Sequence, residues 1–247
     1  MSESRYNPEE LLIVLLSRQV RDGEVCACGA NSMLPAAALL LARELHAPDT
    51  EIMILGSRTF FPFRTSRQFH FMAQRGELDL FFLGGLQIDR LGNYNLHQLG
   101  TDPERPQRRF PGGFGGGLLY YATKRVILFR TEHSPRTMVE RVDFISAAAQ
   151  TPPDVLRHGG LDKVVTPLAI MSPSAEDGSL RLESANPPHT PQVVQERTGF
   201  DLHLRGDESL TPEPTDAELA ALRGPVRTTM MQTGTYPEWA EHNLPAA

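Results

Sequence analysis

The glycine-rich segment at residues 111–117, Pro-Gly-Gly-Phe-Gly-Gly-Gly, has the clearest chemical potential in this sequence. It directly precedes an apolar stretch, residues 118–122, that is predicted to be helical. Backbone N–H groups free of side chains at a helix start can bind an anion or stabilise a developing oxyanion. The segment is not a P-loop, which needs Lys and Ser or Thr where Leu118 and Leu119 stand, and it lacks the Rossmann glycine spacing. A tight strand-to-helix crossing is the structural alternative.

Other side chains that could do chemistry are scattered along the chain. Cys26 and Cys28 share one face of a short predicted strand, and we expect them to pack as small apolar residues. The eight histidines show no metal-binding spacing, so no metal site is expected. His70 and His97 are interpreted as packing or surface residues and are given no catalytic role.

The elements that must position these residues alternate between strand and helix patterns over the first 145 residues. Continuous apolar strands separated by helices indicate an α/β fold with an open, mainly parallel sheet and helices on both faces. Gly92 and Asn93 predict a tight hairpin turn between Ile88 and Tyr94. The predicted strands or extended pieces are residues 24–28, 52–55, 78–83, 126–129, 142–145, 164–171 and 180–185. The predicted helices are residues 8–21, 33–45, 68–75, 118–122 and 192–198.

Composition excludes several classes of protein. With 247 residues, 40% hydrophobic and 22% charged, the chain is expected to fold around a sizeable core. Its 24 basic and 30 acidic residues give a net charge of −6, so a nucleic-acid partner is not expected. The longest apolar run, residues 33–42, is about half a membrane span, and we expect no membrane contact and a cytoplasmic location. We predict one α/β domain at residues 1–210 and a C-terminal surface extension at residues 211–247.

Several motifs, in the same order along the chain, resemble the B subunit of family I coenzyme A (CoA) transferases. The similarity is greatest to glutaconate CoA-transferase and covers the chain to about residue 205. The matching pieces are residues 47–49 (Ala-Pro-Asp), 71–73 (Phe-Met-Ala), 85–89 (Gly-Leu-Gln-Ile-Asp), 92–95 (Gly-Asn-Tyr-Asn), the glycine segment, 142–144 (Val-Asp-Phe), 164–166 (Val-Val-Thr) and 198–201 (Thr-Gly-Phe-Asp).

The resemblance implies an open sheet of the CoA-transferase (NagB/RpiA-like) type and an active site shared by an A and a B subunit. It also implies transfer of CoA from an acyl-CoA donor to a carboxylic acid through a glutamyl-CoA thioester, without a metal or a tightly bound cofactor. Gly115 and Gly116 would then stabilise the oxyanion through their backbone amides. Gly113, Phe114 and Gly117 would approach the CoA thioester.

The sequence departs from the family pattern at the nucleophile. Leu55 occupies the position of the family's glutamate, and an alkyl side chain cannot attack a thioester. Glu51 lies four residues earlier, about 13 Å away along a strand, so it cannot substitute. Ser57 and Arg58 follow the strand and are candidates for substrate binding, with Arg58 suited to a carboxylate. A structural hydroxyl at Ser57 and a solvated Arg58 are the alternatives.

Three functions remain open. The first is the B subunit of a CoA-transferase-like enzyme that acts on acyl-CoA thioesters. The second is a CoA-thioester hydrolase or ring-opening C–C hydrolase, similar to the steroid-ring-degrading branch of the family, which uses a carboxylate of its A subunit. The third is a non-catalytic CoA-binding subunit. Each implies an A-subunit partner in a heterodimer or heterotetramer.

Overall fold

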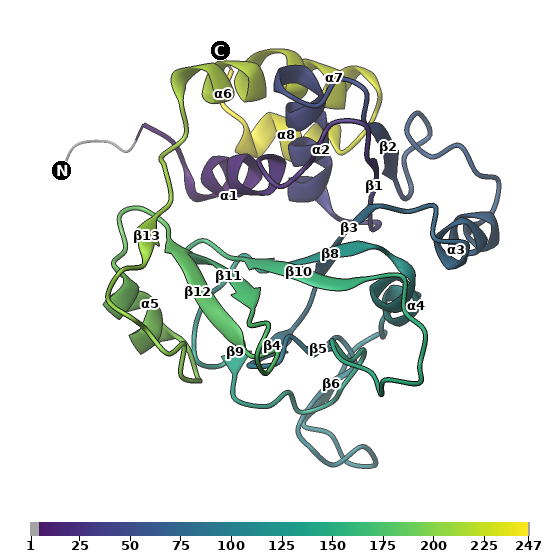
Figure 1. Cartoon of the computed structure of the whole chain (residues 1–247). Coiled ribbons are helices and arrows are strands. Elements are labelled where there is room, and N and C mark those ends of the chain that lie inside the picture. The colour runs from purple at the N-terminus through teal and green to yellow at the C-terminus, as the bar shows by residue number, and fades with distance from the viewer. Residues whose placement is uncertain (1–4, 247) are drawn as a thin grey trace.

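An eight-stranded sheet runs through the molecule, whose computed structural model describes residues 5–246 (Figure 1). Strands β2, β1, β3, β8 and β10 form a parallel block, and β11 is antiparallel to both β10 and β12. The predicted α/β class and mainly parallel sheet are therefore confirmed. Across the sheet the order is β13 (Ser209–Leu210), β12 (Leu180–Ala185), β11 (Ala169–Pro173), β10 (Gly160–Val165), β8 (Arg125–Phe129), β3 (Leu80–Gly84), β1 (Val25–Cys28) and β2 (Glu51–Ile54).

Helices cover both faces of this sheet. Successive side chains of a strand point to opposite faces, so these apolar strands present buried side chains on both sides. In β1, Cys26 and Cys28 enter one apolar core and Ala27 enters the other. The core that contains the cysteines is covered by α1 (Pro8–Ser17) and α2 (Met33–Leu45). The other is covered by α3 (Ser66–Gln74), α4 (Gly116–Ala122) and α5 (Pro191–Arg197).

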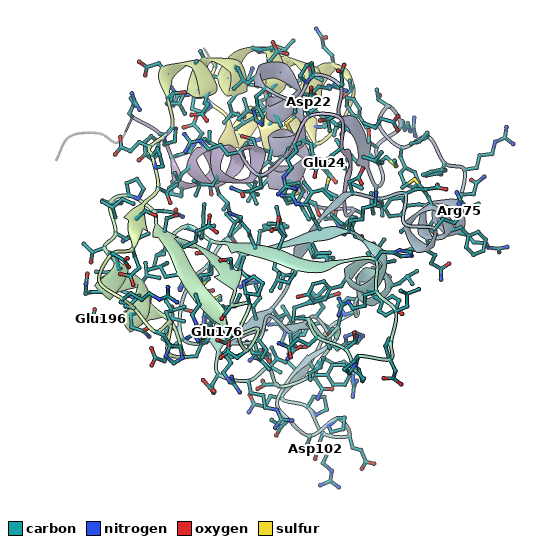
Figure 2. All side chains as sticks on the ribbon, viewed as in Figure 1. Asp22, Glu24, Arg75, Asp102, Glu176 and Glu196 are labelled. Atoms are coloured by element: carbon teal, nitrogen blue, oxygen red, sulfur yellow. The ribbon has the colours of Figure 1, made fainter. Side chains whose placement is uncertain are left out.

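Two small sheets lie below the main sheet in the view of Figure 1. The predicted hairpin at Gly92 and Asn93 is confirmed, since Ile88 pairs with Tyr94 and Asp89 accepts hydrogen bonds from the Asn93 amide and side chain at 3.0 and 3.1 Å. Asp102 lies at the outer end of the loop that joins β6 to β7 (Figure 2). The strands are β4 (Gln87–Asp89), β5 (Tyr94–Asn95) and β9 (Met138–Val139) in one sheet, and β6 (Gln98–Leu99) and β7 (Arg108–Arg109) in the other.

The C-terminal segment differs from the predicted surface extension. Its apolar residues Leu219, Leu222, Val226 and Met230 recur at helical spacing and are buried, the last three in the core shared with α1 and α2. The segment's Pro, Thr and Glu content hid this pattern in the sequence. It folds into α6 (Asp216–Ala221), a π-helical turn (Leu222–Val226), α7 (Arg227–Gln232) and α8 (Pro237–Asn243).

Two ion pairs fasten this C-terminal segment to α1. Arg223 Nε donates to Glu10 Oε1 at 2.6 Å, and the Glu10 side chain is only 1% exposed. Arg18 holds both carboxylate oxygens of Glu218, at 2.7 and 2.8 Å. The C-terminal helices therefore complete the cover of one sheet face. Across residues 5–246, no helix combines the length and apolar character needed to cross a bilayer.

Two other extended segments differ from their predictions. Residues 142–145 form no strand, because the amides of Val142 and Asp143 donate to side chains of β4 at 3.5 and 3.0 Å and not to a strand backbone. The chain bridges to β5 only beyond this segment, where Ala147 pairs with Tyr94. Residues 164–171 are not one extended piece. The Thr166 amide donates to Ala169 O at 3.0 Å in a turn that separates β10 from β11.

His133 is buried between two threonine hydroxyls. Its Nε2 lies 2.9 Å from Thr198 Oγ1, which donates its own hydrogen to Val194 O, and its Nδ1 lies 2.7 Å from Thr166 Oγ1. A neutral imidazole satisfies this arrangement, with Nε2 as donor and Nδ1 as acceptor. Burial, reinforced by His189, lowers the pKa of His133 to about 4.

This low pKa predicts a loss of stability in mild acid. The histidine of the unfolded chain takes up a proton near pH 6.5, whereas His133 of the folded protein does so only near pH 4. The contribution of neutral His133 to the free energy of unfolding is therefore complete above pH 6.5 and is lost as the pH falls from 6.5 toward 4. Between pH 7.5 and pH 5 we expect a loss of about 2 kcal/mol in the free energy of unfolding. Urea titrations of the wild type and of His133→Gln should show that the variant lacks this component. Equal pH dependence in both would contradict the assignment.

Candidate functional site

A cavity of about 440 Å³ opens at the carboxyl ends of the parallel strands, where α/β proteins place their ligands. The cavity brings together segments that are distant in the sequence: the loop after β1, the residue after β2, the end of β3 and the glycine segment. Its lining residues are Gly29, Ala30, Asn31, Ser32, Leu55, Phe81, Phe82, Leu83, Gly84, Leu86, Leu96, Phe110, Pro111, Gly112, Gly113, Phe114, Gly116, Leu119 and Phe129.

The glycine segment turns sharply into α4. Gly112 and Gly115 have φ values of +105° and +82°, and Phe114 has a φ of +47° with an 82% exposed side chain. Left-handed backbone of this kind favours glycine, so Phe114 is held in an uncommon conformation at the mouth of the cavity. The segment is therefore a tight crossing into a helix, as the structural alternative predicts. Part of its backbone also lines the cavity.

The structure changes which amides are available for an oxyanion. The Gly116 N–H donates to Gly113 O at 2.6 Å, so this predicted oxyanion donor is already occupied by the turn. The amides of Gly115, Gly117 and Leu118 have no backbone acceptor within residues 5–246, as expected for the first turn of a helix. The amides of Gly115 and Gly117 remain without a backbone acceptor. Because all three residues are glycines, the sequence does not show that only the Gly116 amide is already bonded.

Two polar atoms lie directly beneath the glycine segment. A Cβ atom added to Gly115 would lie 2.5 Å from His70 Nε2, and one added to Gly116 would overlap the hydroxyl of Tyr94. Both atoms are buried without a hydrogen-bond partner among the described protein groups. The sequence interpretation treated His70 as a packing residue and gave Tyr94 no role of its own. The signal available in the sequence was the adjacent pair Gly115 and Gly116, because glycine is favoured where another atom lies too close to the backbone for a Cβ.

Leu55 lines the cavity together with the glycine segment. It directly follows β2, its amide donates to Cys28 O at 3.1 Å, and its side chain is half-buried. Glu51 lies at the other end of β2, and its side chain is exposed. The structure therefore brings Leu55 and the glycine segment to one site, as the resemblance implied, and keeps Glu51 away from it.

Ser57 and Arg58 lie outside the lining of this cavity. Ser57 Oγ accepts hydrogen bonds from the amides of Phe60 and Thr59 at 3.1 and 3.3 Å and lies 3.0 Å from Thr235 Oγ1. These bonds close the turn after β2, which is the structural alternative for this hydroxyl. Arg58 is exposed to solvent.

His97 supports the glycine segment from the side. Its Nδ1 lies 2.5 Å from Ser146 Oγ, which also accepts from the Leu96 amide at 2.7 Å. A Cβ atom on Gly113 would meet His97 Cε1 at 3.5 Å, an ordinary packing distance. His97 thus acts as a fixed wall for the segment, consistent with the packing role given to it.

The cavity lining is electrically neutral. Asn31 and Ser32 supply its polar side chains, and the lining contains no Asp, Glu, Lys, Arg or His. Burial raises the pKa of the Cys26 and Cys28 thiols, which keeps both protonated in the core. Within the described residues, no group of three His, Cys, Asp or Glu side chains is arranged to hold a metal ion. The lining that this chain provides is therefore apolar side chains, glycine backbone and two neutral polar side chains.

Comparison with known proteins agrees with this architecture. The coenzyme A transferase family model matches residues 57–197. The chain belongs to the coenzyme A transferase family. The B subunit of 3-oxoadipate CoA-transferase from Pseudomonas knackmussii is 30% identical over 89% of this chain and 93% of that protein. The B subunit of glutaconate CoA-transferase from Acidaminococcus fermentans is 27% identical over 87% and 91%.

Other relatives of this CoA-transferase family chain carry different reaction names. The IpdB subunit of the cholesterol ring-cleaving hydrolase from Mycobacterium tuberculosis is 32% identical over 57% of this chain and 57% of that protein. The decarboxylase AibA/AibB superposes with a TM-score of 0.76 at 26% identity, over 98% and 99% of the two chains. The crystal structure of Acidaminococcus fermentans glutaconate CoA-transferase gives a TM-score of 0.78 at 22% identity, over 89% and 94%, and shows the shared fold. The predicted family and its correspondence to B subunits are confirmed.

Proposed function

We propose that this chain is the B subunit of a heteromeric enzyme that acts on acyl-CoA thioesters, and that the A subunit supplies the catalytic carboxylate. The observation that carries this proposal is that Leu55 lines the same cavity as the glycine segment, which has free amides. The site has surface for a thioester and donors for its oxygen, but it has no nucleophile or base of its own.

The glycine segment supplies electrostatic stabilisation. When a nucleophile adds to a thioester, or when a proton leaves the carbon next to it, negative charge develops on the carbonyl oxygen. The amides of Gly115, Gly117 and Leu118 have no backbone acceptor within residues 5–246 and lie next to lining residues Phe114, Gly116 and Leu119, so they are available to an oxygen at the edge of the cavity. Donors fixed in this way commonly contribute about 10²–10³ in rate each.

The partner must supply the acid–base group, because none of the carboxylates in residues 5–246 lines the cavity. Glu51 is separated from Leu55 by the length of β2, and the Ser57 hydroxyl is engaged in its turn. Proton transfer by a side chain needs hydrogen-bond reach of the reacting atoms. An acidic residue of the A subunit facing Leu55 meets this need. Arg58, at the surface, is left to contact a part of the substrate that extends beyond the cavity.

Hydrolysis or C–C cleavage is the second candidate reaction, and the missing glutamate favours it. A ping-pong transferase needs a carboxylate that carries CoA, whereas a hydrolase needs a base, an oxyanion site and water. The similarities to IpdB and to AibA/AibB, whose names denote a hydrolase and a decarboxylase, are in line with chemistry other than CoA transfer. A third candidate, a non-catalytic subunit that only binds CoA, predicts no dependence of turnover on this cavity.

The heteromer is tested by co-expression with the cognate A subunit. We expect a single joint peak in size-exclusion chromatography and turnover of acyl-CoA, measured as free CoA or acyl transfer to acetate, only with both chains present. The chain alone is expected to be inactive because its cavity lacks a titratable group. Full activity of the isolated chain would refute the proposal.

A further inference from the structure

The lining of the cavity at Leu55 also indicates what kind of acyl group fits the site. Its wall is built from apolar side chains that come from four parts of the fold: β3, the end of β8, the residues just before β4 and just after β5, and the residue before the glycine segment. Aliphatic and aromatic groups surround the space, which lies within the range of about 300–1,000 Å³ typical of small-molecule sites. The side chains concerned are Phe82, Leu83, Leu86, Leu96, Phe110 and Phe129.

Among residues 5–246, no Lys, Arg or His side chain lines the cavity. The Arg130 side chain, which lines a separate polar cavity, is turned to Gly85 O, and Arg58 is exposed outside the lining. His97 is bonded to Ser146, and His70 Nε2 is buried beneath Gly115. The polar side chains of the lining, Asn31 and Ser32, are neutral.

We infer that the acyl group accepted by this site is uncharged and largely apolar, and that an acyl group ending in a carboxylate is excluded. This inference rests on the proposed function, which places the thioester at the glycine segment. A terminal carboxylate entering this space would lose its hydration without gaining a cation from this chain, which is strongly unfavourable. An alkyl chain or ring of similar size would gain from removal of its surface from water.

The inference sets this chain apart from relatives whose names denote dicarboxylic acids. The 3-oxoadipate and glutaconate enzymes are similar to it over most of their length, so family similarity alone does not predict an apolar acyl group. The prediction comes from the side chains that line this cavity.

Two non-hydrolysable thioethers of matched length test the inference independently of the reaction catalysed. The complex of this chain with its A subunit is titrated calorimetrically with S-hexyl-CoA and with S-(5-carboxypentyl)-CoA, which differ only at the end of the chain. We expect S-hexyl-CoA to bind at least about 100-fold more tightly, because a site that leaves a buried charge unpaired discriminates strongly. Equal binding, or tighter binding of the carboxylate, would overturn the inference.

A second experiment introduces a positive charge into the cavity wall. Leu96 lines the cavity and is half-buried, and its backbone amide is held by Ser146, so its side chain can change without loss of that bond. Leu96→Arg should tighten binding of the carboxylated thioether by about 10-fold or more, and Leu96→Met should not. If Leu96→Arg fails to fold, the wild-type comparison decides alone. If neither thioether binds the wild-type complex, the proposed function fails and the inference falls with it; if both bind equally, only the inference fails.

Discussion

Replacing Gly116 with alanine is expected to lower the free energy of unfolding by about 1–3 kcal/mol, the usual cost of an overpacked core. The new methyl group would overlap the Tyr94 hydroxyl, which is fully buried and cannot move aside into solvent. Gly116 has no positive φ and begins α4, so alanine itself suits the backbone. The overlap with one oxygen atom is therefore the whole reason for the loss.

A second substitution should restore stability. In Gly116→Ala with Tyr94→Phe the offending oxygen is gone, and the remaining neighbours of the methyl group are Leu83 Cδ2 at 3.4 Å and Tyr94 Cζ at 3.6 Å, which are ordinary contacts. Because alanine is favoured over glycine in a helix by about 1 kcal/mol, the double variant should be at least as stable as the wild type. Chemical denaturation of the four chains measures the coupling. Failure of Tyr94→Phe to rescue Gly116→Ala would contradict the packing described here.

Matched controls separate this contact from general effects of the substitutions. Tyr94→Phe alone should leave stability unchanged or raised, since its hydroxyl has no described partner. Tyr120→Phe, in the ring packed against it, should lose about 1 kcal/mol, because its hydroxyl donates to Gly92 O at 2.7 Å. Gly113→Ala should be neutral, since its methyl group meets His97 at 3.5 Å.

Gly115 is a poorer position for testing the oxyanion role. Its φ of +82° disfavours any side chain, and an added Cβ would also meet His70 Nε2 at 2.5 Å. In Gly115→Val, backbone strain, a buried clash and loss of space for the thioester would all lower turnover, so the measurement could not separate them. Gly113→Ala changes the cavity wall alone and therefore tests whether the substrate needs the space beside the segment.

Much of the fold was predictable because its signals are local. The apolar runs that became β1, β2, β3 and β8 are continuous, as strands buried on both faces must be. The turn at Gly92 was visible because few residues other than glycine suit its φ of +80°. The C-terminal helices were missed because their apolar residues are thinly spaced among Pro, Thr and Glu, and only contact with α1 and α2 makes them a core.

The site was predictable only in part. The resemblance assigned Leu55 and the glycine segment to the active site, and both line one cavity, while their roles stay predictions. The internal bond of the Gly116 amide and the turn role of Ser57 depend on backbone geometry that no residue type reveals. The unpartnered atoms of His70 and Tyr94 are likewise features of burial, which the sequence does not display.

In the proposed function, this chain contributes backbone amides to catalysis and no nucleophile. A ping-pong CoA-transferase must pass through a thioester between CoA and a protein carboxylate. Leu55 is predicted to stand at the family's nucleophile position, and no carboxylate of residues 5–246 lines the cavity, so the proposed function gives this chain no group that carries CoA. The expected effect is all or none, which makes it the most direct observable.

Intact-protein mass spectrometry of the complete complex, incubated with a competent acyl-CoA and then reduced with borohydride to trap any glutamyl thioester, makes this measurement. We expect no CoA adduct and no reduced glutamate on any peptide of this chain. An adduct confined to the A subunit would indicate transfer chemistry carried by the partner, and release of free CoA without an acid acceptor or any adduct would indicate hydrolysis. A CoA adduct on a glutamate of this chain would contradict the account.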